Sequence, residues 1–104
     1  MNKNQRTLIC TSVLFFGHKD EDAFFEWIKK IDWIENYYGS GRDLYLELSG
    51  CDMPDENLQD IIALFHRYNV DMKQLKKCLT DSNKTWFYDN KKAFWHKKVF
   101  GEAE

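Results

Sequence analysis

The side chains that could act as nucleophiles or metal ligands are scattered along this chain of 104 residues. The histidines and cysteines are His18, His66, His96, Cys10, Cys51 and Cys78. Zinc sites and disulfide frameworks use closely spaced pairs such as CxxC, and the sequence contains no such pair. A cysteine nucleophile would have to be assembled from Cys51 or Cys78 with His66, which no spacing supports. We therefore expect no metal, no cofactor and no thiol chemistry, and reduced cysteines as in the cytoplasm.

Carboxylates are concentrated in the middle of the chain. Between Asp20 and Asp60 stand twelve Asp or Glu residues against three Lys or Arg residues, a net charge of −9. A catalytic acid–base pair needs converging geometry and an unusual environment, and a solvated run of acids provides neither. We expect a protein that is not an enzyme and whose acidic segment forms a docking surface, since uneven charge chiefly concerns partners.

The C-terminal segment has the opposite charge and many aromatic rings. From Asn83 to Gly101 the net charge is +4, from five lysines and one aspartate. Basic and aromatic residues together can grip phosphates and stack bases, so a small nucleic-acid-binding module is the alternative function. Its lysines would be Lys91, Lys92, Lys97 and Lys98. We expect no nucleic-acid partner, because the acidic segment repels polyanions.

The interpretation we favour for this tail is structural. Asp89 is placed to cap a helix that runs to about Val99, with Gly101 just beyond its end. The aromatic rings would pack on the core while the lysines remain in solvent. The rings expected to cap the core are those of Trp86, Phe94, Trp95 and Phe100.

Hydrophobic patterns predict the elements of the N-terminal part. Met1 to Gln5 is polar and expected to fray. Arg6 to Phe16 predicts a strand, and because both of its alternating sets are apolar, we expect cover on both faces. Asp20 to Ile31 predicts an amphipathic helix. The longest apolar run, Val13 to Phe16, is too short to span a bilayer, so we expect no membrane association. Thr11 and Ser12 interrupt what would otherwise resemble a signal peptide, and we expect a cytoplasmic protein.

A Gly-Ser-Gly sequence separates two further strand patterns, Trp33 to Tyr38 and Asp43 to Leu48. Glycine adopts the positive φ angles of a tight turn without steric cost, so this stretch predicts a β-hairpin. A phosphate-binding loop would instead require the GxxxxGK[ST] pattern and a following helix.

The stretch from Asp55 to Leu79 organises the rest of the chain. Apolar residues at steps of three and four predict a core-facing helix that begins with Asp55 as its N-cap. Asn69 interrupts this pattern, and Asp71 is placed to cap a second helix. Two such helices cannot bury their apolar sides alone. We therefore predict one small α+β domain over residues 1–104, in which a β-hairpin or small antiparallel sheet packs against three to four helices.

The alternation of the hairpin also predicts a partner-binding surface. Leu44, Leu46 and Leu48 share the core face of the second arm, so Tyr45 and Glu47 face away from the core or toward a covering partner. Glu35 and Tyr37 alternate along the first arm and are expected to extend this surface. The complete predicted set is Glu35, Tyr37, Asp43, Tyr45, Glu47, Asp52, Asp55 and Glu56.

The sequence resembles small bacterial immunity proteins that are encoded beside contact-dependent growth inhibition toxins and related polymorphic toxins. The segments that carry the resemblance lie between Asp20 and Gly101: FFEWIKKI, the GSG hairpin with LYLEL, IIALFHRYNVDMKQL and NKTWFYDNKKAFWHKKVFG. The resemblance implies a cytoplasmic, non-catalytic protein that binds one cognate toxin domain and blocks its active site or substrate groove. Many such toxins are nucleases with basic surfaces, which an acidic surface would complement.

Overall fold

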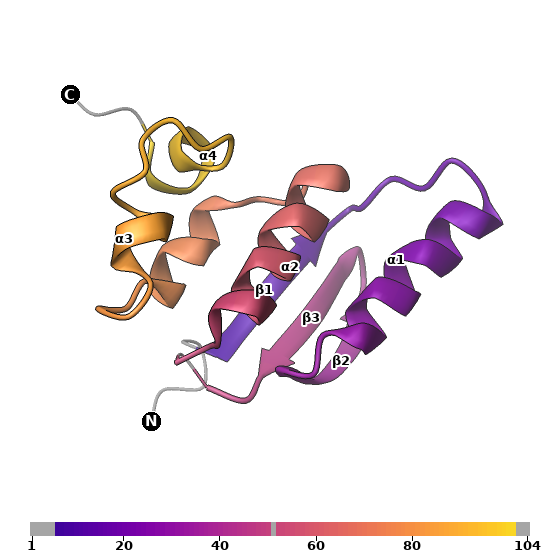
Figure 1. Ribbon diagram of the computed structural model, residues 1–104. Coiled ribbons are helices and arrows are strands. Elements are labelled where there is room, and N and C mark those ends of the chain that lie inside the picture. Colours follow the sequence, from indigo (N-terminus) through magenta and orange to yellow (C-terminus); the bar gives the residue numbers. More distant parts are fainter. Residues whose placement is uncertain (1–5, 51, 102–104) are drawn as a thin grey trace.

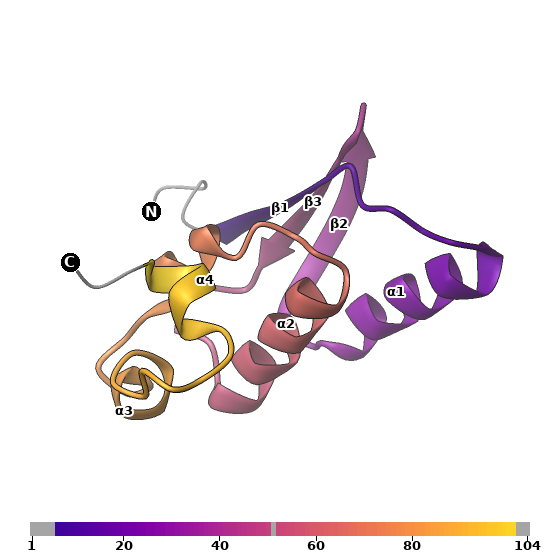
Figure 2. The same ribbon diagram turned by 90° about the horizontal axis from the view of Figure 1, so that it is seen from above.

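The computed structural model describes residues 6–50 and 52–101, and Cys51 lies outside them. Three strands form one antiparallel sheet in the order β1–β3–β2. The elements, in chain order, are β1 (Thr7–Thr11), α1 (His18–Lys30), β2 (Ile34–Ser40), β3 (Asp43–Leu48), α2 (Asp55–Arg67), η2 (Lys73–Cys78), α3 (Lys84–Phe87) and α4 (His96–Phe100). Helices α1 and α2 lie side by side on one side of the sheet (Figure 1, Figure 2). The α+β class predicted from the sequence is confirmed.

The predicted hairpin is present, and its turn is tight. β2 pairs with β3 as far as Ser40 opposite Asp43, so only Gly41 and Arg42 form the turn. Gly41 has φ 62°, a left-handed value that glycine adopts freely. Leu46 and Leu48 are buried beneath the helices, and Leu44 packs against the same core. The alternation of β3 therefore predicts its core face correctly.

The first strand is shorter and less covered than its apolar sequence predicts. β1 ends at Thr11, and Ser12 turns away with φ 51° while its N–H donates to the Arg42 carbonyl (2.8 Å). Leu8 and Cys10 are buried, whereas Ile9 is 37% exposed. The prediction of cover on both faces was wrong, because the described helices form a layer on one face of the sheet only (Figure 2).

The two long helices supply most of the core opposite the sheet. α1 buries Phe24 and Ile28, as its predicted stripe requires. α2 buries the apolar residues at steps of three and four that predicted it, Leu58, Ile61, Ile62 and Phe65, and also Leu64. Asp55 is the first residue of α2 rather than its N-cap, which is Pro54. A carboxylate in the first turn still favours the positive end of the helix dipole.

The second member of the predicted helix pair is a short 3-10 helix. Asn69 has φ 57° and separates it from α2. Met72 rather than Asp71 is the N-cap of η2, so the predicted cap was wrong. The Asp71 carboxylate instead accepts a hydrogen bond from the Lys73 N–H (3.0 Å), which closes a turn at the entrance of the helix. Leu75 and Cys78 of η2 are buried and anchor it to the core.

The predicted single helix from Asp89 to Val99 was wrong, because the tail forms two short helices, α3 and α4, separated by turns. Asp89 pairs with Lys84 (3.1 Å) instead of capping a helix. The break brings the Trp95 indole back to the end of α3, where its N–H donates to the Phe87 carbonyl (3.0 Å). Carbonyls at helix ends lack partners within the helix, so this bond satisfies one of them. Gly101 follows α4 with φ 79°, as predicted.

Candidate protein-binding face of the sheet

One face of the sheet carries no helix in the described part of the chain. Figure 2 shows α1 and α2 on the same side of the three strands and no described helix over the other side. Side chains alternate along a strand, so every second residue points to this uncovered side. We call it the open face; its residues are Thr7, Ile9, Thr11, Asn36, Tyr38, Ser40, Asp43, Tyr45 and Glu47.

Aromatic and aliphatic groups form the centre of the open face. The register places Ile9, Tyr45 and Tyr38 beside one another on the three neighbouring strands. The two tyrosine rings are stacked, with centroids 5.1 Å apart and planes 7° from parallel. Tyr38 is 44% exposed and Ile9 is 37% exposed. Exposed tyrosine with apolar neighbours is typical of surfaces that bind proteins.

Acidic side chains border this centre. Asp43 and Glu47 precede and follow Tyr45 on the same side of β3, and both are half-buried. Glu35 lines a small recess with Glu47, Thr7 and Arg6. The Asn36 amide donates to the Glu47 carboxylate (3.4 Å). The structure therefore brings together four of the predicted residues: Glu35, Asp43, Tyr45 and Glu47.

Tyr37 was predicted to lie on this surface, and that prediction was wrong. The register of β2 shifts between Ile34 and Asn36, which marks a bulge with Glu35 as the extra residue. An inserted residue reverses which following side chains face the core. Tyr37 consequently packs on the helical side, with its ring centroid 5.8 Å from that of Phe25 in α1. Tyr38 takes the place on the open face that alternation assigns to Tyr37.

The acids at the entrance of α2 also lie apart from the open face. Asp55 and Glu56 are exposed in the first turn of α2, which belongs to the layer on the opposite side of the sheet (Figure 2). Asp52 is exposed in the preceding connection. These three acids, which were predicted to belong to the same partner-binding set as Asp43, therefore do not lie on the open face.

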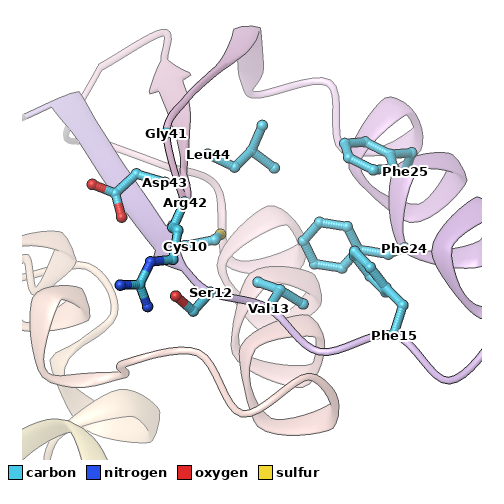
Figure 3. Close-up of a pocket in the computed structure, with 10 residues that line it drawn as sticks. All are labelled: Cys10, Ser12, Val13, Phe15, Phe24, Phe25, Gly41, Arg42, Asp43 and Leu44. Carbon is cyan, nitrogen blue, oxygen red and sulfur yellow. The ribbon is translucent and has the colours of Figure 1, made fainter.

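An apolar recess opens at the hairpin end of the domain, between the sheet and α1. Its volume is about 470 Å³. Figure 3 shows the rings of Phe15, Phe24 and Phe25 on one side of it and Cys10 and Leu44 on the other. The side chains of Arg42 and Asp43, at the hairpin tip, point away from these rings. This recess has room for an apolar side chain of a partner, but its inner wall offers little polar chemistry.

Sequence reasoning missed several exposed apolar residues. Leu14 is 67% exposed and Phe16 is 87% exposed in the connection between β1 and α1. Tyr38 was not singled out because the bulge that turns it outward has no signal in the sequence. Ile9 could have been found, since it alternates with the buried Leu8 and Cys10 on a strand at the sheet edge.

The cysteines that the structure describes, Cys10 and Cys78, lie in the core. Burial raises the pKa of the Cys10 thiol to about 12, which leaves it protonated and unreactive at neutral pH. Cys78 is buried too. Within residues 6–50 and 52–101, no group of three His, Cys, Asp or Glu side chains is arranged to hold a metal ion. None of the described helices is long and apolar enough to cross a bilayer.

Comparison with known proteins adds no assignment to this geometry. The chain matches no protein-family model, and no match was found among curated proteins or solved structures.

Proposed function

We propose that this protein is an immunity protein, which binds a cognate toxin domain through the open face of its sheet and neutralises it. The single observation that supports this most strongly is the uncovered sheet face, where the stacked Tyr38 and Tyr45 are bordered by Asp43 and Glu47. A sheet that packs on one side only leaves a broad, rigid surface for a partner. The resemblance of the sequence to immunity proteins points to the same function.

The chemistry of this face favours a basic protein as the partner. Tyrosine is enriched among the few central, water-excluded residues that contribute most of the binding energy of an interface. Carboxylates around them raise the association rate of a positively charged partner and discourage acidic ones. A nuclease domain has a basic substrate groove, and an acidic face seated in that groove would exclude nucleic acid.

A second candidate function is supported by one exposed ring in the C-terminal segment. Phe94 was expected to cap the core but is 53% exposed, with its ring 4.6 Å from that of His66. The four lysines of this segment, Lys91, Lys92, Lys97 and Lys98, are exposed. A nucleic-acid-binding module would use such a surface, whereas Trp86, Trp95 and Phe100 pack against the core. This alternative predicts salt-sensitive RNA or DNA binding that is lost on replacing these lysines.

The test compares two charge reversals on opposite layers of the domain. Asp43→Lys with Glu47→Lys alters the open face, and Asp55→Lys with Glu56→Lys changes the charge equally at the entrance of α2. Both variants are measured for binding to the toxin domain encoded beside this chain, across a salt series, after urea unfolding has confirmed their stability. We expect the open-face variant to bind at least about tenfold more weakly at low salt, and the control to bind like the parent.

Two outcomes would contradict the proposal. If the parent protein does not bind the toxin domain or protect cells from it, the function is wrong. If the folded open-face variant binds as tightly as the parent at low salt, recognition takes place elsewhere on the molecule.

A further inference from the structure

The sheet has two edges, and side chains of the described residues bind the backbone of the β1 edge. At the outer edge of β1, the Gln74 side-chain amide pairs with the backbone of Ile9 as a neighbouring strand would. Its oxygen accepts from the Ile9 N–H (2.7 Å) and its nitrogen donates to the Ile9 carbonyl (2.8 Å). The Lys77 ammonium donates to the Thr7 carbonyl on the same edge (2.7 Å). Side chains of η2 thus occupy the backbone groups to which a fourth strand would bind.

The opposite edge belongs to β2, and the strand register identifies its outward groups. Ser40 and Asp43 close a two-residue turn, so they exchange backbone hydrogen bonds, as do Tyr38 and Tyr45 two residues away. The N–H and C=O groups of Tyr37 and Gly39 must therefore point away from β3. The same rule applied to β1 predicts that the N–H and C=O groups of Ile9, which is opposite Tyr45, point away from β3. They do, because both bind the Gln74 side chain at the outer edge. No other strand of the described sheet lies beyond β2.

The β2 edge has few of the features by which proteins protect such edges. The strand IENYYGS contains no proline and no lysine, and Tyr38, Gly39 and Ser40 are all exposed. The bulge at Glu35 twists the start of the strand, which leaves the stretch from Tyr37 to Ser40 as the accessible part. Nothing but the Asp43 carbonyl, at 3.9 Å, lies within 4 Å of where a Gly39 Cβ would be. An alanine therefore fits at position 39, and the exposure of Tyr38, Gly39 and Ser40 leaves this edge accessible to a second backbone.

We infer that an extended segment of the toxin domain adds to the β2 edge as a fourth strand, hydrogen-bonded to Tyr37 and Gly39. The inference rests on the proposed function and specifies how that partner binds. Strand addition obtains affinity from the backbone and selectivity from alternate side chains. The added segment would lie beside the open face, whose acids are Asp43 beside the turn and Glu47 opposite Asn36. Charge complementarity therefore assigns basic side chains to the positions of the added strand that face the open side.

The experiment removes one outward N–H and leaves the strand otherwise intact. Gly39→Pro eliminates the Gly39 donor at a position where the N–H is not used within the sheet, which an edge strand tolerates. Gly39→Ala is the matched control, because it adds a side chain and keeps the N–H. Binding to the toxin domain encoded beside this chain is measured for both variants. Hydrogen exchange at the Tyr37 and Gly39 amides is measured for the parent, free and in the complex.

We expect Gly39→Pro to bind at least about tenfold more weakly than the parent, Gly39→Ala to bind within about threefold of it, and the parent's two amides to exchange more slowly in the complex. A folded Gly39→Pro variant that binds like the parent would overturn the inference. If that variant does not fold, unprotected amides in the parent complex would overturn it equally well, and protected ones would support it.

Two further results separate this inference from the function on which it rests. In the first, the open-face charge variant loses toxin binding, but the Tyr37 and Gly39 amides of the parent exchange as fast in the complex as in the free protein. This result would retain the proposed function and refute strand addition. A parent that forms dimers in sedimentation experiments, disrupted by Gly39→Pro, would assign the edge to a second copy of this chain and refute the toxin as its occupant.

Discussion

Gln74 is the residue whose replacement tests the architecture most sharply. Its amide makes two hydrogen bonds to the backbone of Ile9 and a third to the Asp71 carbonyl (2.7 Å). Gln74→Ala removes all three and exposes the outer edge of β1 to water. The substitution leaves the buried apolar side of η2, formed by Leu75 and Cys78, intact.

The expected loss of stability follows from what replaces these bonds. A hydrogen bond contributes about 0.5–1.5 kcal/mol net when water can substitute for a lost partner. Three bonds would then contribute about 1.5–4.5 kcal/mol, but fixing a Gln side chain costs about 1.5–2 kcal/mol of rotamer entropy that alanine does not lose. The difference runs from about −0.5 to about 3 kcal/mol, and we expect Gln74→Ala to destabilise the fold by its middle value, about 1 kcal/mol. For a domain of this size each kcal/mol corresponds to about 4–8 °C in Tm.

The assay is urea unfolding followed by tryptophan fluorescence, with sedimentation velocity on the same samples. Lys76→Ala is the control, since Lys76 is an exposed neighbour on η2. We expect the control to unfold like the parent, and Gln74→Ala to unfold earlier and to self-associate as concentration rises, because an uncovered edge pairs with other chains. An unchanged midpoint with a monomeric Gln74→Ala protein would refute the reasoning that this amide replaces a strand.

The remaining predictions concern the core. Phe87→Ala should lower the free energy of unfolding in urea by about 3–5 kcal/mol, because Phe87 is fully buried. Trp95→Ala should lower it by less, because Trp95 is half-buried. A larger loss for Trp95→Ala would show that Trp95, and not Phe87, is the main contact between the C-terminal segment and the core. Burial raises the pKa of Cys10 from 9.0 to about 12 in the folded state, so above about pH 9 the thiol loses its proton more readily in the unfolded state. The contribution of Cys10 to the free energy of unfolding is therefore complete below about pH 9 and falls above it by at most about 1.4 kcal/mol per pH unit. The stability of the Cys10→Ala variant should decline less than that of the parent between about pH 9 and pH 12. Equal declines in the two proteins would contradict a raised pKa for Cys10. Joint replacement of Cys10 and Cys78 should lower stability but not toxin binding, as measured on folded protein.

The helical layer could be predicted from the sequence because each helix buries a stripe whose period is set by the helix itself. The apolar steps of α1 and α2 specify which side chains reach the core, and Phe24, Ile28, Leu58 and Phe65 are buried accordingly. The alternation of β3 likewise placed Tyr45 and Glu47 on the side away from the core. These are local rules, in which the geometry of the element fixes the direction of each side chain.

The sequence by itself therefore determined the fold class, the two long helices, the hairpin and the outward side of its second arm. Tertiary structure decided which further residues join that side. The bulge at Glu35 turns Tyr38 outward and Tyr37 inward, and it depends on how β2 pairs with β3 rather than on either strand alone. The separation of Asp55 from Asp43 and the covering of β1 by Gln74, 65 residues away from Ile9, are likewise outcomes of packing. Contacts between residues so distant in the chain leave no periodic signal, because they depend on how the layers meet.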